Sequence, residues 1–354
     1  MAMDHGTPQR AGLPALNLLN NIPMETNVKK TSRWTHGLKF ALTGVLMSLT
    51  LACAHAQADK PLIKVLVGYP PGAGSDALAR IYAEALGQTI NVNAVVENKP
   101  GAGGQIAAQA LKLASPDTNT VMLTMDHQVV MIPLITKNPG FDVRKDLTPV
   151  ARVVTFNTCF AISGSSPVQS LQAHMETVKV KPEAGNYGIP APGSQAQFVG
   201  YVVGKHFKAL MNPVPYRGAA PAIVDLLGGQ VASVVVPCDA LTEHRKAGKV
   251  RILAIAAEQR SPTLPDVPTF DELGVKMPYD NFVAVYAPAT MKPDMLRQIT
   301  DATRQMFQSQ KVVDKFNATG MTAAYASPED LRRILDQTSS FWAEQVRQTN
   351  FQAE

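Results

Sequence analysis

The sequence has few cysteines, a low charge content and no basic stripe. Three cysteines among 354 residues exclude a disulfide-dense scaffold and a cysteine-rich metal site. Charged residues make up 17% of the chain, and the formal net charge is +5. A predicted leader, residues 1–58, holds five basic and two acidic residues, which leaves 28 basic against 26 acidic side chains. A nearly neutral chain of this kind lacks the electrostatic surface that nucleic-acid binding requires.

Two motifs typical of enzymes are incomplete. Gly101 and Gly103 begin a G-x-G-x-x-G pattern, but Ile106 stands where the third glycine belongs. Ser75 and Ser194 each follow a glycine near an expected helix start, yet neither lies in a G-x-S-x-G nucleophile motif. We therefore predict no enzyme activity, no catalytic residue, no cofactor and no metal site. A periplasmic serine hydrolase that uses Ser75 or Ser194 is the weaker alternative.

What the sequence does contain begins with an export signal. Basic residues between positions 29 and 39 precede an apolar run over 40–53, and Ala56-Gln57-Ala58 supplies the small residues of a cleavage site. The apolar run is short for a membrane span, so we predict cleavage after Ala58 and a periplasmic mature protein. Whether translation starts at Met1 or Met24 stays open.

Cleavage would remove Cys53 and leave Cys159 and Cys238. An oxidising compartment permits a disulfide between them. Both cysteines lie in apolar, strand-like runs, where a small buried hydrophobic residue is the commoner role. We therefore expect unpaired, buried cysteines, although the sequence leaves their pairing open.

A strand, glycine-rich loop and helix open the mature chain. Residues 64–67 are a short strand, the prolines and glycines of 70–74 form a turn, and Ser75 or Asp76 is the expected N-cap of a helix that continues through Leu86. Helix starts expose unpaired backbone N–H groups, so such a loop can bind a carboxylate or phosphate without a lysine or arginine. An ordinary connection that binds nothing is the alternative.

A second loop of the same kind lies further along the chain. Residues 186–194 are rich in glycine and proline, and a helix is expected from Gln195 to Leu210. Because each loop ends at a helix start, two such loops facing one cleft would hold one small anion between them.

Three further side chains are candidates for ligand contact. Asp126 and His127 follow an expected strand over 120–125, and the carboxyl ends of strands face the crevice in an open parallel sheet. A lone histidine at such a place is more often simply hydrogen-bonded. Arg217 lies on a loop before an expected helix and is either a ligand cation or a solvated capping residue.

The order of the apolar segments predicts two lobes. A strand-like passage over 147–162 suits a crossing from one lobe to the other, and residues 281–287 return the chain. We predict one lobe from residues 59–152 and 284–354 and a second lobe from residues 153–283.

Several long segments then resemble one family. They are Tyr69-Pro70-Pro71-Gly72, Val96–Gly104, Val214–Gly218, Asp225–Val231 and Leu264–Thr269. In this order they resemble the Bug family, the periplasmic solute-binding receptors associated with tripartite tricarboxylate transporters. The resemblance implies an α/β type II periplasmic-binding-protein fold, with two α/β lobes joined by two crossing strands. It also implies that the lobes close on a small carboxylate held by two facing loops.

The resemblance also carries ligand-binding positions. In the first loop they are Tyr69, Pro71, Gly72, Gly74, Ser75 and Asp76, and in the second Gly188, Gly193 and Ser194. Ile189 stands where the family usually has a small hydroxyl residue. An apolar residue in the cleft favours a ligand with an apolar or aromatic part.

The resemblance leaves two roles open. The predicted function is capture of a small carboxylate for the membrane subunits of a tripartite transporter. The alternative is a sensory adaptor that reports the ligand to a membrane sensor kinase. We expect a monomer that binds no nucleic acid, and the sequence does not identify the carboxylate.

Overall fold

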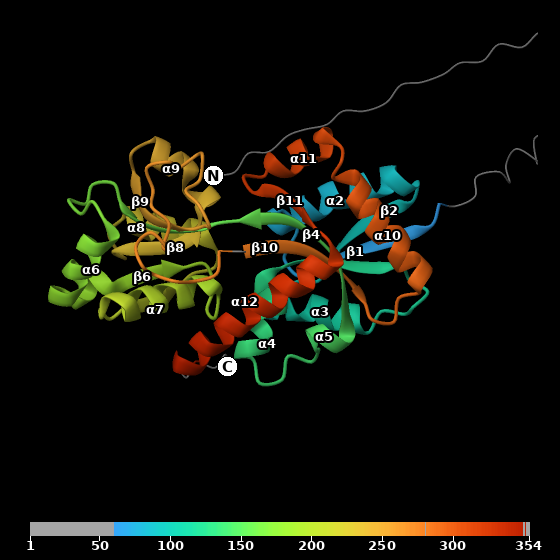
Figure 1. Ribbon diagram of the computed structural model, residues 1–354, viewed down its shortest axis with the longest axis horizontal. Helices are drawn as coiled ribbons and strands as arrows, with labels where there is room; N and C mark the ends of the chain where they lie inside the picture. Colours follow the sequence, from blue (N-terminus) through green and yellow to red (C-terminus); the bar gives the residue numbers. More distant parts are fainter. Residues whose placement is uncertain (1–59, 280, 350, 352–354) are drawn as a thin grey trace, which may run out of the picture. The chain divides into compact units, whose positions relative to one another are not determined.

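The computed structural model describes residues 60–279, 281–349 and 351, and all of them fall in the unit that begins at Lys60. The predicted leader and its cleavage after Ala58 lie outside the described residues. Two β-sheets with covering helices make up this unit (Figure 1).

The first sheet has six strands in the order β11-β4-β10-β3-β1-β2. They are β1 (Leu62–Val67), β2 (Asn93–Asn98), β3 (Thr120–Met125), β4 (Leu147–Phe156), β10 (Asn281–Pro288) and β11 (Thr322–Ala326). β1 pairs in parallel with β2 and β3, whereas β10 pairs antiparallel with both β3 and β4. The central strands are buried on both faces, which explains their nearly continuous runs of valine, leucine and alanine.

The second sheet has five strands in the order β7-β6-β8-β5-β9. They are β5 (Thr158–Ser163), β6 (Asn186–Ile189), β7 (Asn212–Pro215), β8 (Ser233–Pro237) and β9 (Val250–Ala256). β5 pairs antiparallel with β8 and β9, and β6 pairs in parallel with β7 and β8. Each sheet therefore mixes parallel βαβ units with antiparallel crossing strands.

Helices cover both sheets. The α-helices are α2 (Gly74–Ile90), α3 (Gln105–Lys112), α4 (Ile132–Ile135), α5 (Val143–Asp146), α6 (Leu171–Val180), α7 (Gln195–Phe207), α8 (Ala219–Leu227), α9 (Thr242–Lys246), α10 (Pro293–Met306), α11 (Gln310–Asn317) and α12 (Pro328–Thr349). Short 3-10 helices are η1 (Ala102–Gly104), η3 (Pro182–Gly185) and η4 (Cys238–Leu241), and η2 (His127–Met131) is a π-helix. Within the described residues, no helix is both long enough and apolar enough to cross a membrane.

Most local predictions agree with these elements, and two differ. The expected passage over 147–162 is interrupted at Asn157, which separates β4 from β5. The N-cap of α2 is Ala73 rather than Ser75 or Asp76, so the helix starts two or three residues earlier than a polar cap would place it. Ser327 caps the start of α12, because its Oγ accepts the Asp330 N–H at 3.1 Å.

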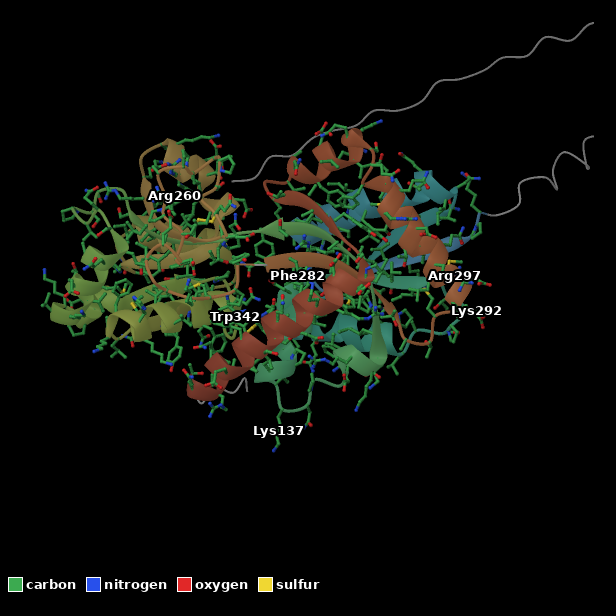
Figure 2. All side chains as sticks on the ribbon, in the orientation of Figure 1. Lys137, Arg260, Phe282, Lys292, Arg297 and Trp342 are labelled. Atoms are coloured by element: carbon green, nitrogen blue, oxygen red, sulfur yellow. A yellow bond between two sulfur atoms is a disulfide. The ribbon has the colours of Figure 1, made fainter. Side chains whose placement is uncertain are left out.

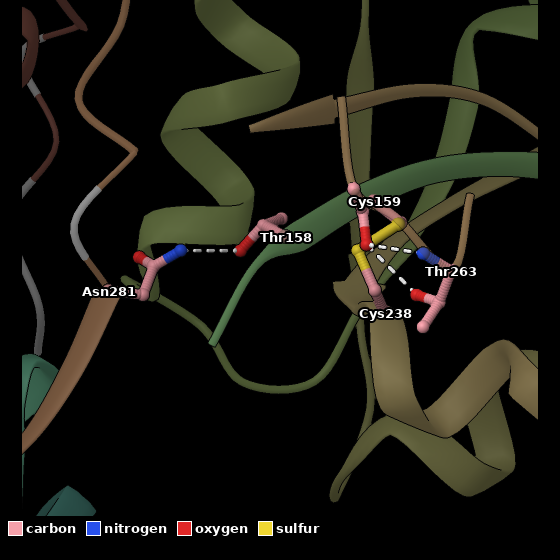
Figure 3. Close-up of a disulfide and its surroundings, with 6 residues drawn as sticks. Thr158, Cys159, Cys238, Thr263 and Asn281 are labelled. Atoms are coloured by element: carbon pink, nitrogen blue, oxygen red, sulfur yellow. Dashed lines mark hydrogen bonds between the residues drawn. A yellow bond between two sulfur atoms is a disulfide. The ribbon is translucent and has the colours of Figure 1, made fainter. Parts of the chain in front are cut away.

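The connections between the two sheets run side by side. β4 leads into β5, and the chain returns from the second sheet through β10, which lies along β4 in the first sheet (Figure 1). The predicted joins at 152–153 and 283–284 fall within β4 and β10. Asn281 Nδ2, at the start of β10, donates to Thr158 Oγ1 at 3.1 Å, which ties the returning strand to the start of β5 (Figure 3).

A disulfide joins Cys159 and Cys238 (Figure 3). Our expectation of unpaired cysteines was therefore wrong. β5 and β8 pair antiparallel, and Cys238 directly follows β8, so their Cα atoms lie 5.0 Å apart, well within reach of a disulfide. The apolar runs correctly indicated burial of Cys159, whereas Cys238 is only partly buried. They gave no sign that the two strands are neighbours.

The last helix contacts both halves of the fold. α12 packs on β4 of the first sheet and on α7 beside the second. Trp342 in α12 is 2% exposed, and its ring lies 6.3 Å from that of Phe198 in α7. Figure 2 labels Trp342 and Phe282 of β10, both in the middle of the protein.

Candidate functional site

A cavity of about 570 Å³ lies between loops that follow strands of both sheets. It is lined by Tyr69, Ala73, Met125, Asp126, His127, Phe156, Thr158, Pro190, Ala191, Pro192, Ser194, Gln195, Ala196, Tyr216, Arg217, Gly218 and Pro237. The connection between β4 and β5 borders it through Phe156 and Thr158. A pocket of this size, mostly apolar with a few polar groups, is typical of a small-molecule site.

The first wall is the loop after β1 and the start of α2. The Asp76 carboxylate accepts hydrogen bonds from the Gly72 N–H at 3.0 Å, Arg80 Nε at 2.9 Å and Asn98 Nδ2 at 2.9 Å. The Arg80 hydrogen bond is the main reason why the pKa of Asp76 falls to about 2, and the bonds from Gly72 and Asn98 add to it. Asp76 therefore holds the loop in shape. Among the described residues, the N–H groups of Gly74 and Ser75 have no hydrogen-bond partner.

The second wall is the loop after β6 and the start of α7. Ser194 Oγ donates to the Ala191 carbonyl at 2.7 Å, and the Gly193 N–H donates to Gln197 Oε1 at 2.8 Å. Gly193 has φ +67°, and a Cβ there would clash with Ile135 of α4, so only glycine fits without rearrangement. The Gln195 and Ala196 N–H groups have no partner within the described part of the chain.

A buried carboxyl group lies at the end of β3. Asp126 is 3% exposed, and its Oδ2 accepts the Phe282 N–H at 3.2 Å. Burial raises the pKa of Asp126 to about 7, opposed by the Phe282 and His127 backbone N–H groups and by the nearby Gln195 amide. Gln195 Nε2 nevertheless makes no hydrogen bond in the described structure.

The groups around Asp126 stay neutral near pH 7. Burial first, and then the charge of Asp126, raises the pKa of Tyr69. Burial lowers the pKa of His127 to about 4, and its Nδ1 has no partner among the residues described. The carboxyl group of Asp126 thus faces weakly polar surroundings rather than a counter-ion.

A cation and an oriented ring also line the cavity. Arg217 is exposed and lines the cavity, and no ion pair joins it to another described residue. The Tyr216 hydroxyl donates to Asp225 Oδ2 at 2.7 Å, which fixes the ring beside Arg217. Burial, and next this hydrogen bond, raises the pKa of Tyr216 to about 12.

The structure brings part of the predicted residue set together. Five predicted residues line the cavity: Tyr69, Asp126, His127, Ser194 and Arg217. The others shape the loops without lining it: Pro71, Gly72, Gly74, Ser75, Asp76, Gly188, Ile189 and Gly193. Ile189 is fully buried in β6, so it does not supply apolar surface to the cavity.

Sequence reasoning missed four lining side chains of note. Gln195 is the first residue of a helix that was correctly predicted, so its place at a helix start could have indicated that it lines the cavity. Phe156 and Thr158 flank the break between β4 and β5, which the sequence did not reveal. Tyr216 lay next to the candidate Arg217 and could have been found through that neighbour. No group of three or more residues suited to hold a metal ion occurs in the described ranges.

Comparison with known proteins shows the family of the chain. The family model described as the tripartite tricarboxylate transporter family receptor matches residues 78–351. The chain belongs to this receptor family. Receptors of this family are periplasmic solute-binding proteins that work with the membrane subunits of tripartite transporters. The resemblance to the Bug family and the function that it implied are therefore confirmed.

Individual relatives support the same assignment. Protein BugT of Bordetella pertussis is 32% identical over 319 residues, which is 87% of this chain and 96% of that protein. The solved periplasmic binding protein BugD is 26% identical with a TM-score of 0.70, covering 83% of this chain and 99% of its own. MatC of Rhodopseudomonas palustris, solved with bound malate, shares the fold at 23% identity and a TM-score of 0.70, covering 80% of this chain and 98% of its own. The predicted two-lobe α/β fold of periplasmic receptors is confirmed.

Proposed function

We propose that this receptor binds its carboxylate in the cavity between the two loops. The observation that supports the site is that two helix starts border one cavity, that of α2 through its N-cap Ala73 and that of α7 through Gln195 and Ala196. The N–H groups of the first two residues of each helix have no partner in the described structure. Each helix N-terminus contributes about 0.3 to 2 kcal/mol toward an anion, in addition to the hydrogen bonds.

The proposed contacts differ in kind. Tyr69 and Ser194 line the cavity beside the helix starts, and Arg217 adds a positive charge on the exposed side. The remaining predicted loop residues hold the backbone in place, as Asp76 does through Gly72. Direct contact with the ligand is therefore proposed for the cavity-lining residues and for the free N–H groups.

The lining supports a ligand with an apolar or aromatic part. Phe156, Met125, Pro190 and Pro192 supply carbon surface to the cavity. Burying such surface contributes about 25 cal/mol per Å². These residues, and not Ile189, supply the apolar surface that the sequence analysis expected in the cleft.

The mode of action that we propose is closure of two lobes. One lobe carries the six-stranded sheet and the other the five-stranded sheet, and the joins lie where β4 meets β5 and where the chain enters β10. Binding between loops of both lobes would stabilise a closed form. We also propose that the mature receptor is a periplasmic monomer, released by cleavage after Ala58, that delivers its ligand to the transporter without turning it over.

A thermal-shift screen tests the proposed function. The mature receptor is heated with a panel of monocarboxylates, dicarboxylates, tricarboxylates and aromatic acids, each beside its uncharged amide. At least one acid is expected to raise the melting temperature while its amide does not. Failure of every carboxylate to shift the transition, or an equal shift by the amides, would contradict a carboxylate site.

The best acid then serves in two further measurements. Solution scattering should show a smaller radius of gyration at saturating ligand, and mass spectrometry should recover the acid unchanged after prolonged incubation. An unchanged scattering curve would argue against lobe closure, and a converted ligand would argue against a purely binding role.

A further inference from the structure

Asp126 is a buried carboxyl group without a cation. In the described residues it accepts a backbone N–H from Phe282, and no lysine or arginine side chain pairs with it. The titratable groups that face it are Tyr69 from the loop after β1, His127 on its own segment and Tyr286 of β10. The charge of Arg332 in α12 lowers the pKa of Tyr286 but does not shift the pKa of Asp126. A buried carboxylate is costly unless something pairs with it, so the missing partner requires an explanation.

Asp126 borders the cavity and does not lie sealed in the core. It lines the cavity together with Tyr69, Phe156 and Tyr216, three aromatic residues from three different segments. Aromatic ring faces attract cations, especially where water is excluded. A carboxyl group among aromatic rings is a typical setting for an ammonium group. Gln195 Nε2, also buried and unpartnered, adds a hydrogen-bonding group to the same part of the cavity.

The lining of the cavity thus includes groups of both polarities. The starts of α2 and α7 and the Arg217 side chain favour negative charge. Asp126 and the aromatic rings favour positive charge. A ligand with only carboxylates leaves Asp126 without a cation.

We propose that the ligand is an aminocarboxylate, whose carboxylate binds at the helix starts and whose ammonium group pairs with Asp126. This inference rests on the proposed function, because it assumes that a carboxylate occupies the cavity. It adds Asp126 as the residue that selects amino-bearing acids over acids of the same carbon skeleton.

Matched ligand pairs test the inference by calorimetry on the mature receptor. The probes are 3-phenylpropionate with phenylalanine, pentanoate with norvaline, and glutarate with glutamate. In at least one pair the amino acid is expected to bind about tenfold or more tightly than its partner, since one charge-assisted contact of about 1.4 kcal/mol gives that factor. If the simple acids bind and the amino acids bind no better, the inference is overturned while the proposed function stands. If none of the six probes binds, the inference is overturned, and the wider thermal-shift screen separately decides whether the proposed function stands.

Asp126→Asn keeps the acceptor oxygen for Phe282 and removes the charge. The variant should lose the preference that the wild type shows for the amino acid over its simple acid. Asp239→Asn is the matched control: its carboxyl group is also partly buried, but it lines a different cavity. An unchanged preference in Asp126→Asn would overturn the inference.

The pH dependence of the wild type is a second readout that needs no variant. Tyr69 and Tyr286 stay neutral, and His127 with a pKa of about 4 is neutral above pH 5.5. Of the described groups at this point of the cavity, Asp126 is therefore the one that changes its charge between pH 5.5 and 8. The preference for the amino acid should grow as the pH rises through about 7 and Asp126 ionises. A preference that shrinks over this range would instead show a protonated Asp126 donating to a second acid group, and would overturn the inference.

Discussion

The ring of Trp342 in α12 lies 6.3 Å from the ring of Phe198 in α7, at a tilt of 52°. α12 begins beside the first sheet, whereas α7 covers the second, so this pair joins the end of the chain to the other lobe. Phe351 adds an edge-on contact to Phe198 at 5.6 Å. The C-terminal helix is thus a third link between the lobes, beside the two crossing strands.

Removing this indole should destabilise the whole protein. Trp342→Ala is expected to lower the free energy of unfolding by roughly 3–5 kcal/mol, because it leaves a cavity where a large buried ring packed. Urea denaturation followed by circular dichroism measures the change. Leu113→Ala, at a position 80% exposed, is the control and should change stability by less than about 0.5 kcal/mol. Equal effects of the two substitutions would show that the Trp342 contact contributes little.

The disulfide should stabilise the receptor measurably. Cys159 and Cys238 are separated by 79 residues, and closing a loop of that order restricts the unfolded chain by roughly 3–5 kcal/mol in the chain-entropy model. We expect dithiothreitol to lower the unfolding midpoint of the wild type in urea. The double variant Cys159→Ala with Cys238→Ala should unfold at one midpoint with or without reductant. If thiol labelling shows that dithiothreitol has fully reduced the wild type and its unfolding midpoint has not fallen, the prediction is contradicted.

Arg217 and the helix starts compete as the main carboxylate contact. Arg217 is exposed, so water weakens its attraction for the ligand, whereas the helix starts offer fixed N–H groups. Arg217→Ala should therefore weaken binding of the best acid by less than about a hundredfold, near 2.8 kcal/mol. Calorimetry on this variant decides the matter, with Lys137→Ala as the control, since Lys137 projects from the surface in Figure 2. A larger loss would show that a direct ion pair dominates.

Acid should destabilise the receptor partly through His174. Burial lowers the pKa of this histidine, which packs edge-on against Phe160, to about 4. The unfolded chain takes up the proton near pH 6.5, so it binds more protons than the folded chain between pH 6.5 and 4. The contribution of neutral His174 to stability is therefore present above pH 6.5 and is lost as the pH falls through that range.

His174→Gln removes this proton uptake. Between pH 7 and 5 the variant should lose about 2 kcal/mol less stability than the wild type. Urea titrations at the two pH values measure the difference, and His206→Gln, at an exposed position, should follow the wild type. Because His127 and Asp126 are unchanged in both proteins, their own pH dependences cancel in the comparison. Parallel losses in His174→Gln and the wild type would contradict the prediction.

The strands and loops were predictable because local signals determine them. Valine-rich runs such as 234–236 and 250–256 became β8 and β9, and the glycine and proline loops led directly into α2 and α7. The family resemblance supplied the two-lobe arrangement, which periodicity alone does not contain.

The features that the sequence did not predict depend on contacts between distant segments. No local pattern shows that β5 lies beside β8, so the pairing of Cys159 with Cys238 was not predicted correctly. Asp76 was expected to cap the helix or bind the ligand, whereas in the structure its carboxylate accepts hydrogen bonds from Arg80 and Asn98. The position of Asp126 at the cavity was expected, but its lack of a cation became visible only with every neighbour in place.

The place of β10 in the first sheet has a consequence for folding during export. β3 and β4 do not pair with each other, because β10 lies between them and pairs with both. A chain that is synthesised and translocated from its N-terminus therefore delivers β1 to β4 well before the strand that fills the gap. The five-stranded sheet draws all its strands from Thr158–Ala256, so it can close first. The first sheet is completed only when the last quarter of the chain has been delivered. Until then β3 and β4 have unpaired edges that a chaperone would have to shield.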